Sequence, residues 1–155
     1  MIGAIAALAA VAGALAVVWL RRRYVVVTVR GDSMLPTYRP GERVVLRRAS
    51  PRSLRTGQIV VLTEAGHTPP GARSGESLAP RPAAAPHLII KRVAAVPGDP
   101  IPRDTVPALR TAPGTRVPAG HLVVLGDNAA SSHDSRHSGY LTTDRLLGVV
   151  LRKVG

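Results

Sequence analysis

The 155-residue chain contains no cysteine and no phenylalanine, and aromatic residues make up only 3% of it. The absence of cysteine excludes disulfides and thiolate metal sites. Without phenylalanine, a hydrophobic core must be built from valine, leucine and isoleucine, which favour β-sheets. Aromatic side chains that could stack on nucleic-acid bases are also lacking. The composition therefore predicts a β-rich domain and gives no support to nucleic-acid binding.

Acidic residues are scarce, since 9 Asp and Glu stand against 21 Lys and Arg, which gives a net charge of +12. Much of this charge follows an apolar N-terminal segment. A basic face of this kind can bind anionic membrane lipids. No helix-turn-helix, RNP or zinc-finger pattern supports nucleic acid as the partner instead. A solvated basic surface that aids solubility is the remaining alternative. The arginines near the apolar segment are Arg21–Arg23, Arg43, Arg47, Arg48, Arg52 and Arg55.

The first twenty residues contain no charged side chain and no proline. As a helix they would span about 30 Å, the thickness of the hydrocarbon core of a bilayer. Trp19 and Tyr24 stand where interfacial aromatic residues lie, and Arg21–Arg23 would stop the segment at the headgroups. A cleavable secretory signal is the alternative, but the segment has no basic n-region. We therefore expect a transmembrane anchor over residues 1–20 and one domain over residues 21–155.

The rest of the chain contains short apolar runs bounded by turn residues, which predict strands. Continuous runs of this kind usually pack on both faces, so we expect a closed or folded-over sheet rather than an open, one-sided sheet. Residues 63–87 are rich in Gly, Pro, Ala and Ser and predict a mobile loop. A second proline-rich stretch runs from Pro97 to Pro118. The six candidate strands are 25–29, 43–46, 59–62, 88–90, 121–125 and 147–151.

Two segments far apart in the chain offer a serine nucleophile and a lysine base. Ser33 lies within residues 31–37 (GDSMLPT), and Lys91 begins residues 91–99 (KRVAAVPGD). A serine hydroxyl is a weak nucleophile, and a desolvated neutral lysine amine can take its proton. Apolar neighbours on both sides of Lys91 would bury the amine and lower its pKa, while Arg92 would point to the opposite face of the strand. Taken alone, however, Ser33 is more typical of a serine in a turn than of a nucleophile, and most lysines are exposed.

These two segments resemble boxes of the bacterial signal peptidase I family, which are membrane-bound serine/lysine proteases that remove secretory leader peptides. Residues 57–62 (GQIVVL) and 126–136 (GDNAASSHDSR) are similar to two further boxes of that family. One short motif is a weak signal, but four in the family's order are a specific one. The resemblance implies a β-rich catalytic fold. It also implies that Ser33 is the nucleophile, and that Lys91 is the general base for Ser33 and later for the water that hydrolyses the acyl-enzyme.

The resemblance implies roles for residues around this pair as well. Ser132 would hydrogen-bond the amine of Lys91 and orient it; Ser131 is an alternative, and a serine that only caps a turn is another. The backbone N–H of Ser33 would form the oxyanion hole. Some family members add a serine hydroxyl two residues earlier, where this chain has Gly31 and offers only backbone. The structural ion-pair set would be Asp127, Asp134 and Arg136, and Met34 and Leu35 would line the substrate pocket.

Two other uses of the histidines near residue 133 are disfavoured. A triad of Ser33, His133 and Asp134 would need an aspartate to orient the imidazole of its own neighbour on one loop, and it leaves the Lys91 segment unexplained. His133 and His137 have the i to i+4 spacing of a zinc pair on a helix, but the serines and glycine around them predict a loop. We therefore expect neither a metal nor another cofactor.

The resemblance implies an endopeptidase that removes leader peptides from exported precursors after small residues, in an Ala-x-Ala-like sequence bound as an extended strand. A peptidase dedicated to one precursor is an alternative with the same chemistry. A self-cleaving transcriptional repressor shares the Ser/Lys chemistry but needs a DNA-binding domain in place of the apolar segment. A catalytically inactive, membrane-tethered binding module is the last alternative, suggested by Gly31.

Two arguments about the location of the domain disagree. The resemblance implies a single-pass anchor in the cytoplasmic membrane, with the catalytic domain on the extracytoplasmic face. Arg21–Arg23 after the span, with no basic residue before it, would place the domain in the cytoplasm by the positive-inside rule. We give greater weight to the four boxes. A start codon upstream of Met1 would remove the conflict.

Overall fold

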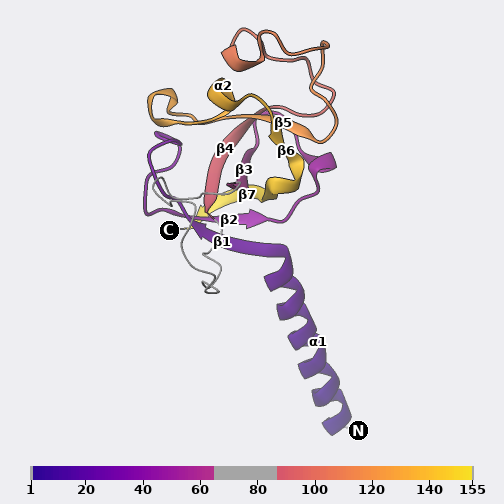
Figure 1. Cartoon of the computed structure of the whole chain (residues 1–155). Helices are drawn as coiled ribbons and strands as arrows, with labels where there is room; N and C mark the ends of the chain where they lie inside the picture. Colours follow the sequence, from indigo (N-terminus) through magenta and orange to yellow (C-terminus); the bar gives the residue numbers. More distant parts are fainter. Residues whose placement is uncertain (1, 65–86, 155) are drawn as a thin grey trace, which may run out of the picture.

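The computed structural model describes residues 2–64 and 87–154, with only the helical backbone for residues 2–9. Within these residues the chain forms one long N-terminal helix and a mainly β domain (Figure 1). The bounds are α1 (Ile2–Arg23), β1 (Tyr24–Thr28), β2 (Arg43–Arg47), η1 (Pro51–Ser53), β3 (Ile59–Thr63), β4 (Leu88–Ala95), η2 (Pro107–Leu109), β5 (His121–Leu125), η3 (Ala129–Ser131), α2 (Ser135–Ser138), β6 (Leu141–Thr142), η4 (Thr143–Arg145) and β7 (Leu146–Val154).

Seven antiparallel strands form one sheet in the order β1-β2-β7-β3-β4-β5-β6. The final strand, β7, lies between β2 and β3. This C-terminal strand therefore connects the β1–β2 pair to the rest of the sheet. The prediction of six strands is confirmed. The sequence missed β6, because a strand of only two residues has too few side chains to show an alternation.

The central strands are buried on both faces, which confirms the expectation of a folded-over sheet. The three middle residues of β3 are buried, and so are those of β5. Val60 and Leu62 of β3 belong to one hydrophobic cluster, whereas Val61 between them belongs to another. Because neighbouring side chains on a strand point to opposite faces, β3 separates two layers of core.

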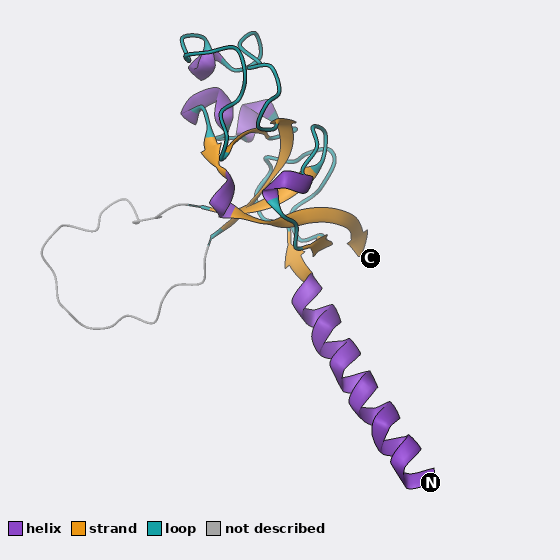
Figure 2. Cartoon of the chain, turned by 90° about the vertical axis from the view of Figure 1, so that its right-hand side faces the viewer, coloured by secondary structure: helices purple, strands orange, loops and turns teal. Residues whose placement is uncertain are grey.

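The proline-rich stretch between β4 and β5 folds into a small excursion with its own core. Ile101, Val106, Leu109 and Val117 are buried there with Ala95 and Val123 of the sheet. This excursion lies at the end of the domain opposite to α1 (Figure 2). The larger apolar residues of the stretch therefore hold it against the sheet.

The N-terminal segment is helical, and α1 projects away from the β domain (Figures 1 and 2). Its described apolar side chains are exposed, among them Val11, Leu15 and Trp19. Within the part of the chain that the structure describes, however, no helix is both long and apolar enough to cross a membrane. The expected transmembrane anchor is thus not supported by the structure. The loop expected over residues 63–87 lies, from residue 65 to 86, outside the described residues; Thr63 itself belongs to β3.

At Gly148, β7 leaves no room for a side chain beside the end of β2. A Cβ at this position would overlap the carbonyl oxygen of Arg47 and lie 2.8 Å from Cδ1 of Leu46. We expect Gly148→Ala to lower the free energy of unfolding by about 1–3 kcal/mol, the usual cost of overpacking. Chemical denaturation measures this change. Gly13→Ala is the matched control, because a Cβ there meets nothing within 4 Å; equal destabilisation by both variants would contradict the prediction.

Candidate active site

Lys91 is a buried lysine in the middle of the sheet. It lies on β4 opposite Val60 of β3, and only 4% of its surface is exposed. Its neighbours two residues away on the same face, Ile89 and Val93, pack into the core. Burial lowers the pKa of Lys91, and Arg136 lowers it further, although Asp134 and Glu64 act in the opposite direction. The environment thus favours the neutral amine that a general base requires.

The amine of Lys91 belongs to a buried chain of hydrogen bonds. Its Nζ donates to Oγ of Ser132 at 2.9 Å, and the Ser132 hydroxyl donates to Oδ2 of Asp134 at 2.6 Å. Because the hydroxyl proton is directed to the carboxylate, the serine oxygen can only accept from the amine. This arrangement fixes the direction of one N–H and leaves the other valences of the nitrogen for a second partner. Ser131, the alternative, is exposed.

Asp134 is held in place from several directions. Its Oδ2 accepts the backbone N–H of Gly126 at 2.8 Å and lies 3.3 Å from Nη1 of Arg136, and its Oδ1 accepts the backbone N–H of Arg136 at 3.0 Å. Burial alone would raise the pKa of Asp134, but the hydrogen bonds from Gly126 and Ser132 and the charge of Arg136 lower it on balance. Asp134 therefore stays charged beneath the Lys91 amine.

Ser33 lies in the turn between β1 and β2, and the segment after β5 holds this turn in place. The backbone N–H of Asn128 donates to the carbonyl of Ser33 at 3.0 Å, and Nδ2 of Asn128 donates to the carbonyl of Asp32 at 3.1 Å. Gly126 allows the close approach: a Cβ there would overlap Ser132 Oγ and lie 2.6 Å from the Ser33 carbonyl oxygen. The Ser33 backbone and the partner of Lys91 thus meet at one point.

Arg92, on the opposite face of β4, binds Asp127 in the segment after β5, and Asp127 in turn binds the Ser33 turn. Its Nε and Nη2 donate to the two carboxylate oxygens of Asp127 at 2.8 and 2.7 Å, and Thr37 of the Ser33 turn donates to the same carboxylate at 2.5 Å. The predicted ion-pair set is therefore divided, since Asp127 pairs with Arg92 and Asp134 with Arg136. The sequence indicated only that Arg92 faces away from Lys91 and carried no signal for its partner.

The other expected site residues have mixed surroundings. Among the described residues, the backbone N–H of Ser33 donates to no acceptor of the protein. Within the same residues, no hydrogen bond joins the Ser33 hydroxyl directly to the Lys91 amine. Gly31 adopts φ +71°, which favours glycine. Met34 is 1% exposed and packs in the core, whereas Leu35 is half-buried.

The histidine segment differs from the expectation. The prediction of a loop is wrong for Ser135–Ser138, which form α2, because Asp134 caps this turn by accepting the backbone N–H of Arg136. The rings of His133 and His137 stack 5.0 Å apart. Among the described residues, no group of three or more His, Cys, Asp or Glu side chains could hold a metal ion.

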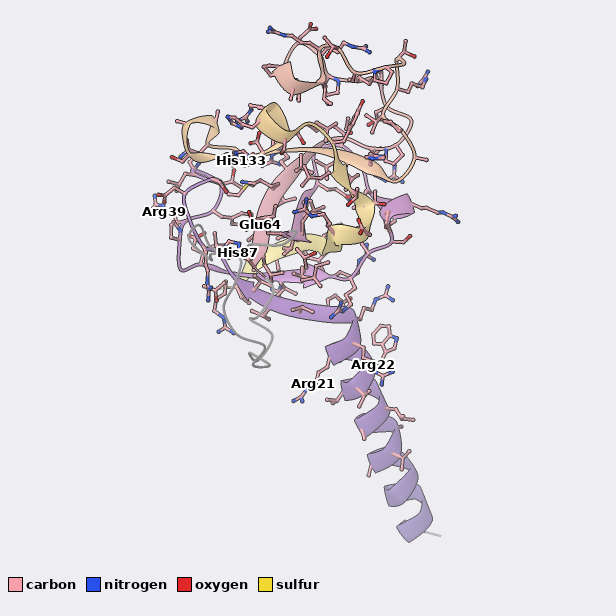
Figure 3. All side chains as sticks on the ribbon, in the orientation of Figure 1. Arg21, Arg22, Arg39, Glu64, His87 and His133 are labelled. Atoms are coloured by element: carbon pink, nitrogen blue, oxygen red, sulfur yellow. The ribbon has the colours of Figure 1, made fainter. Side chains whose placement is uncertain are left out.

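Two cavities flank the first half of β4. One of about 210 Å³ lies beside Lys91 and includes Glu64 and His133 in its walls. The other, of about 350 Å³, lies between β1 and the start of β4, where His87 Nδ1 is 2.7 Å from Glu64 Oε2. Figure 3 shows Glu64, His87, His133 and Arg39 on the same side of the domain. A third cavity, of about 560 Å³, is lined by neither Ser33 nor Lys91.

Because of the Arg92–Asp127 pair, we expect part of the free energy of unfolding to be lost at acidic pH. Hydrogen bonds from Arg92, and secondarily from Thr37, lower the pKa of Asp127 below its ordinary value of 3.8. A carboxyl with a lowered pKa stabilises the folded state fully above the ordinary value and loses this effect as the pH falls through the lowered one. We expect Asp127→Asn to cost about 1–2 kcal/mol at neutral pH and to flatten the acid limb of a stability curve measured by denaturation. An unchanged acid limb would contradict this account.

Similarity to known proteins identifies the family of this chain. The family model "Signal peptidase, peptidase S26" matches residues 2–108 and 103–154. "Probable signal peptidase I-1" of Synechocystis sp. is 30% identical over 141 residues, which is 79% of this chain and 67% of the relative. "Signal peptidase I" of Bacillus caldolyticus is 53% identical over 36 residues, which is 23% of this chain and 20% of the relative. With nearly all of its length matched by the family model, this chain belongs to the signal peptidase (peptidase S26) family.

Proposed function

We propose that this chain is a serine endopeptidase that removes leader peptides from exported precursors, with Ser33 as nucleophile and Lys91 as general base. One observation carries the proposal: a buried lysine with a lowered pKa is oriented by Ser132 and Asp134 next to the turn that bears Ser33. Family membership supplies the reaction class. The chain has only two lysines, and the other, Lys153, is exposed and paired with Glu42.

The residues present support a two-stage reaction. Neutral Lys91 takes the proton of the Ser33 hydroxyl while Ser33 Oγ attacks the scissile carbonyl. The lysine ammonium then gives this proton to the departing amine of the mature protein, which leaves an ester between Ser33 and the leader peptide. Lys91, neutral again, takes a proton from water, and the hydroxide adds to the ester carbonyl. Collapse of that intermediate releases the leader as a carboxylic acid and returns the proton to Ser33.

The oxyanion formed in both stages needs hydrogen-bond donors. The N–H of Ser33 is the best placed, because it is attached to the nucleophile and has no other acceptor among the described residues. The backbone of Gly31 is the second candidate. Because Gly31 has no side chain, this proposal includes no hydroxyl donor there.

The cavity between β1 and β4 is the proposed substrate groove. β1 is the edge strand of the sheet. β4 pairs with β5 only from Arg92 onward, so the first residues of β4 have one unpaired edge. Both unpaired edges lie beside this cavity. An extended peptide can add to such edges through its backbone. Val25, Val27 and Leu88 line the cavity, which suits the small apolar side chains expected before the cleavage site.

We also propose that α1 attaches the enzyme to the cytoplasmic membrane, with the domain on the extracytoplasmic face. The apolar side chains that the structure describes on this helix, from residue 10 onward, are exposed, and Arg23 stacks on Trp19 at 5.1 Å from the ring centre, beside the first strand. Tryptophan and arginine at this junction are typical of a membrane interface.

The mechanism is tested by Ser33→Ala and Lys91→Met against a synthetic leader-bearing peptide in detergent. We expect both variants to lose cleavage, since an apolar methionine fills the site of Lys91 but cannot take a proton. Wild-type kcat should rise with pH between about 6 and 10 as Lys91 deprotonates, with its midpoint below the ordinary lysine value near 10.4. Normal cleavage by Lys91→Met would exclude Lys91 as the base. No cleavage by the wild type of any of several precursors would favour a dedicated peptidase or a binding module.

The positioning role of Ser132 has its own test. We expect Ser132→Ala to lower kcat by about tenfold to a hundredfold with little change in KM, because the amine loses its fixed direction. The pH midpoint should also shift, since Ser132 links Lys91 to Asp134. Ser131→Ala is the matched control, because Ser131 is exposed on the same segment. A pH profile identical to that of the wild type would show that Ser132 acts on folding alone.

A further inference from the structure

Arg30 places a positive charge in the wall of the proposed substrate groove. It lies two residues after the end of β1 and lines the cavity of about 350 Å³ between β1 and the start of β4. Its side chain is exposed and forms no ion pair with any residue that the structure describes. The other titratable residue of this wall, His87, contacts Glu64 at 2.7 Å. The groove thus contains one guanidinium without a counter-charge among the described residues.

The acidic residues close to Arg30 do not pair with it. Glu42, whose carbonyl lies next to Val29, binds Lys153 through its side chain. Asp32 is exposed and forms no ion pair with a described residue. Between Arg30 and Asp32 the chain turns at Gly31, whose φ is +71°. The guanidinium of Arg30 is therefore available to a ligand in the groove.

Backbone hydrogen bonds fix the place of Arg30 relative to Ser33. The N–H of Val29 donates to the carbonyl of Glu42 at 2.8 Å, and the carbonyl of Val29 accepts the N–H of Gly41 at 3.0 Å. Arg30 follows this anchored residue and precedes Ser33 by three positions, which span at most about 11 Å of extended chain. An extended peptide that lies along β1 with its scissile carbonyl at Ser33 therefore passes Arg30 within about four residues of the cleaved bond.

The alternation of side chains along β1 indicates which residues of such a peptide lie beside Arg30. Val25, Val27 and Val29 pack in the core, so Arg30 lies on the opposite, outward face. Side chains that lie opposite each other on neighbouring strands share a face. In the proposed leader, the small residues at the first and third positions before the cleaved bond face the inward, apolar side of the groove. The second and fourth side chains then point outward, to the face of Arg30.

We propose that Arg30 makes this enzyme prefer leader peptides with an aspartate or glutamate at the second or fourth residue before the cleaved bond. A guanidinium binds a carboxylate with two parallel hydrogen bonds, a geometry that neutral side chains do not reproduce. A lysine or arginine of the leader at the same place would meet a like charge, which adds discrimination. Because exposed ion pairs contribute modestly, Arg30 grades substrates and does not exclude neutral ones. The inference rests on the proposed peptidase function and its groove.

The test uses the full chain in detergent and synthetic leader peptides that differ at one residue. Three peptides carry glutamate, glutamine or lysine at the second residue before the cleaved bond, and three more carry them at the fourth. The ratio kcat/KM is measured for the wild type, Arg30→Glu and Arg55→Glu. Arg55→Glu is the matched control, because Arg55 is also exposed but lines none of the three cavities described above.

We expect the wild type to prefer glutamate over glutamine by about twofold to fivefold in kcat/KM at one of the two positions, mainly through KM. Glutamine should in turn be preferred over lysine, and both preferences should decrease at high salt. Arg30→Glu should reverse the order, and Arg55→Glu should keep it. Equal values for the glutamate and glutamine peptides with the wild type would overturn the proposal, as would an equal reversal by both variants.

Binding of fluorescent peptides to Ser33→Ala, measured by anisotropy, separates this proposal from the peptidase function. If Ser33→Ala binds the glutamate peptide more tightly but the wild type cleaves no peptide, the peptidase function fails and the selection by Arg30 stands. If the wild type cleaves all peptides equally, the selection fails and the peptidase function stands. The preference of the wild type is measured without any substitution, and a thermal unfolding curve for each variant shows whether it folds.

Discussion

The burial of one amine governs the rest of this structure. A lysine at 4% exposure in a β-sheet core is costly when charged, so its surroundings must either neutralise it or satisfy its hydrogen bonds. The chain does both, because apolar neighbours on β4 lower the pKa of Lys91 while Ser132 accepts its N–H. Ser132 in turn depends on Asp134, and Asp134 on Gly126 and Arg136. The segment after β5 is thus organised around this one nitrogen.

Neighbouring residues on the two faces of β4 bind different parts of the segment after β5. Lys91 donates to Ser132, and Arg92 donates to Asp127, whose carboxylate also binds Thr37 of the turn that carries Ser33. The turn is tied from both sides, by Asn128 through the backbone of Ser33 and by Asp127 through Thr37. A hydroxyl held on a turn would otherwise be free to move, and displacements of about 1 Å are enough to impair catalysis. Rigid placement of Ser33, the proposed nucleophile, therefore comes from a segment almost one hundred residues later.

Much of the fold could be predicted from the chain by itself. Valine-rich runs between turn residues locate six strands, since β-branched side chains fit a pleated, buried surface, and the lack of phenylalanine is consistent with aliphatic cores. The sequence did not indicate β6 or the one-turn helix α2, because both are too short to show periodicity. It also gave no sign that the excursion from Pro97 to Pro118 has its own core. That core forms only against side chains of the sheet.

The sequence by itself determined the chemistry on offer: a serine in a glycine and proline turn, a lysine among apolar residues, and the order of four segments that identifies the family. Local composition is sufficient for these, because desolvation of Lys91 follows from its strand neighbours. Only the tertiary structure decided which residues meet. In the structure, Ser132 rather than Ser131 accepts the hydrogen bond of Lys91, and Asp127 pairs with Arg92 rather than with Arg136. Met34 is buried. Partners so distant in sequence are selected by sheet register and by the absence of a side chain at Gly126, and neither can be read from local pattern.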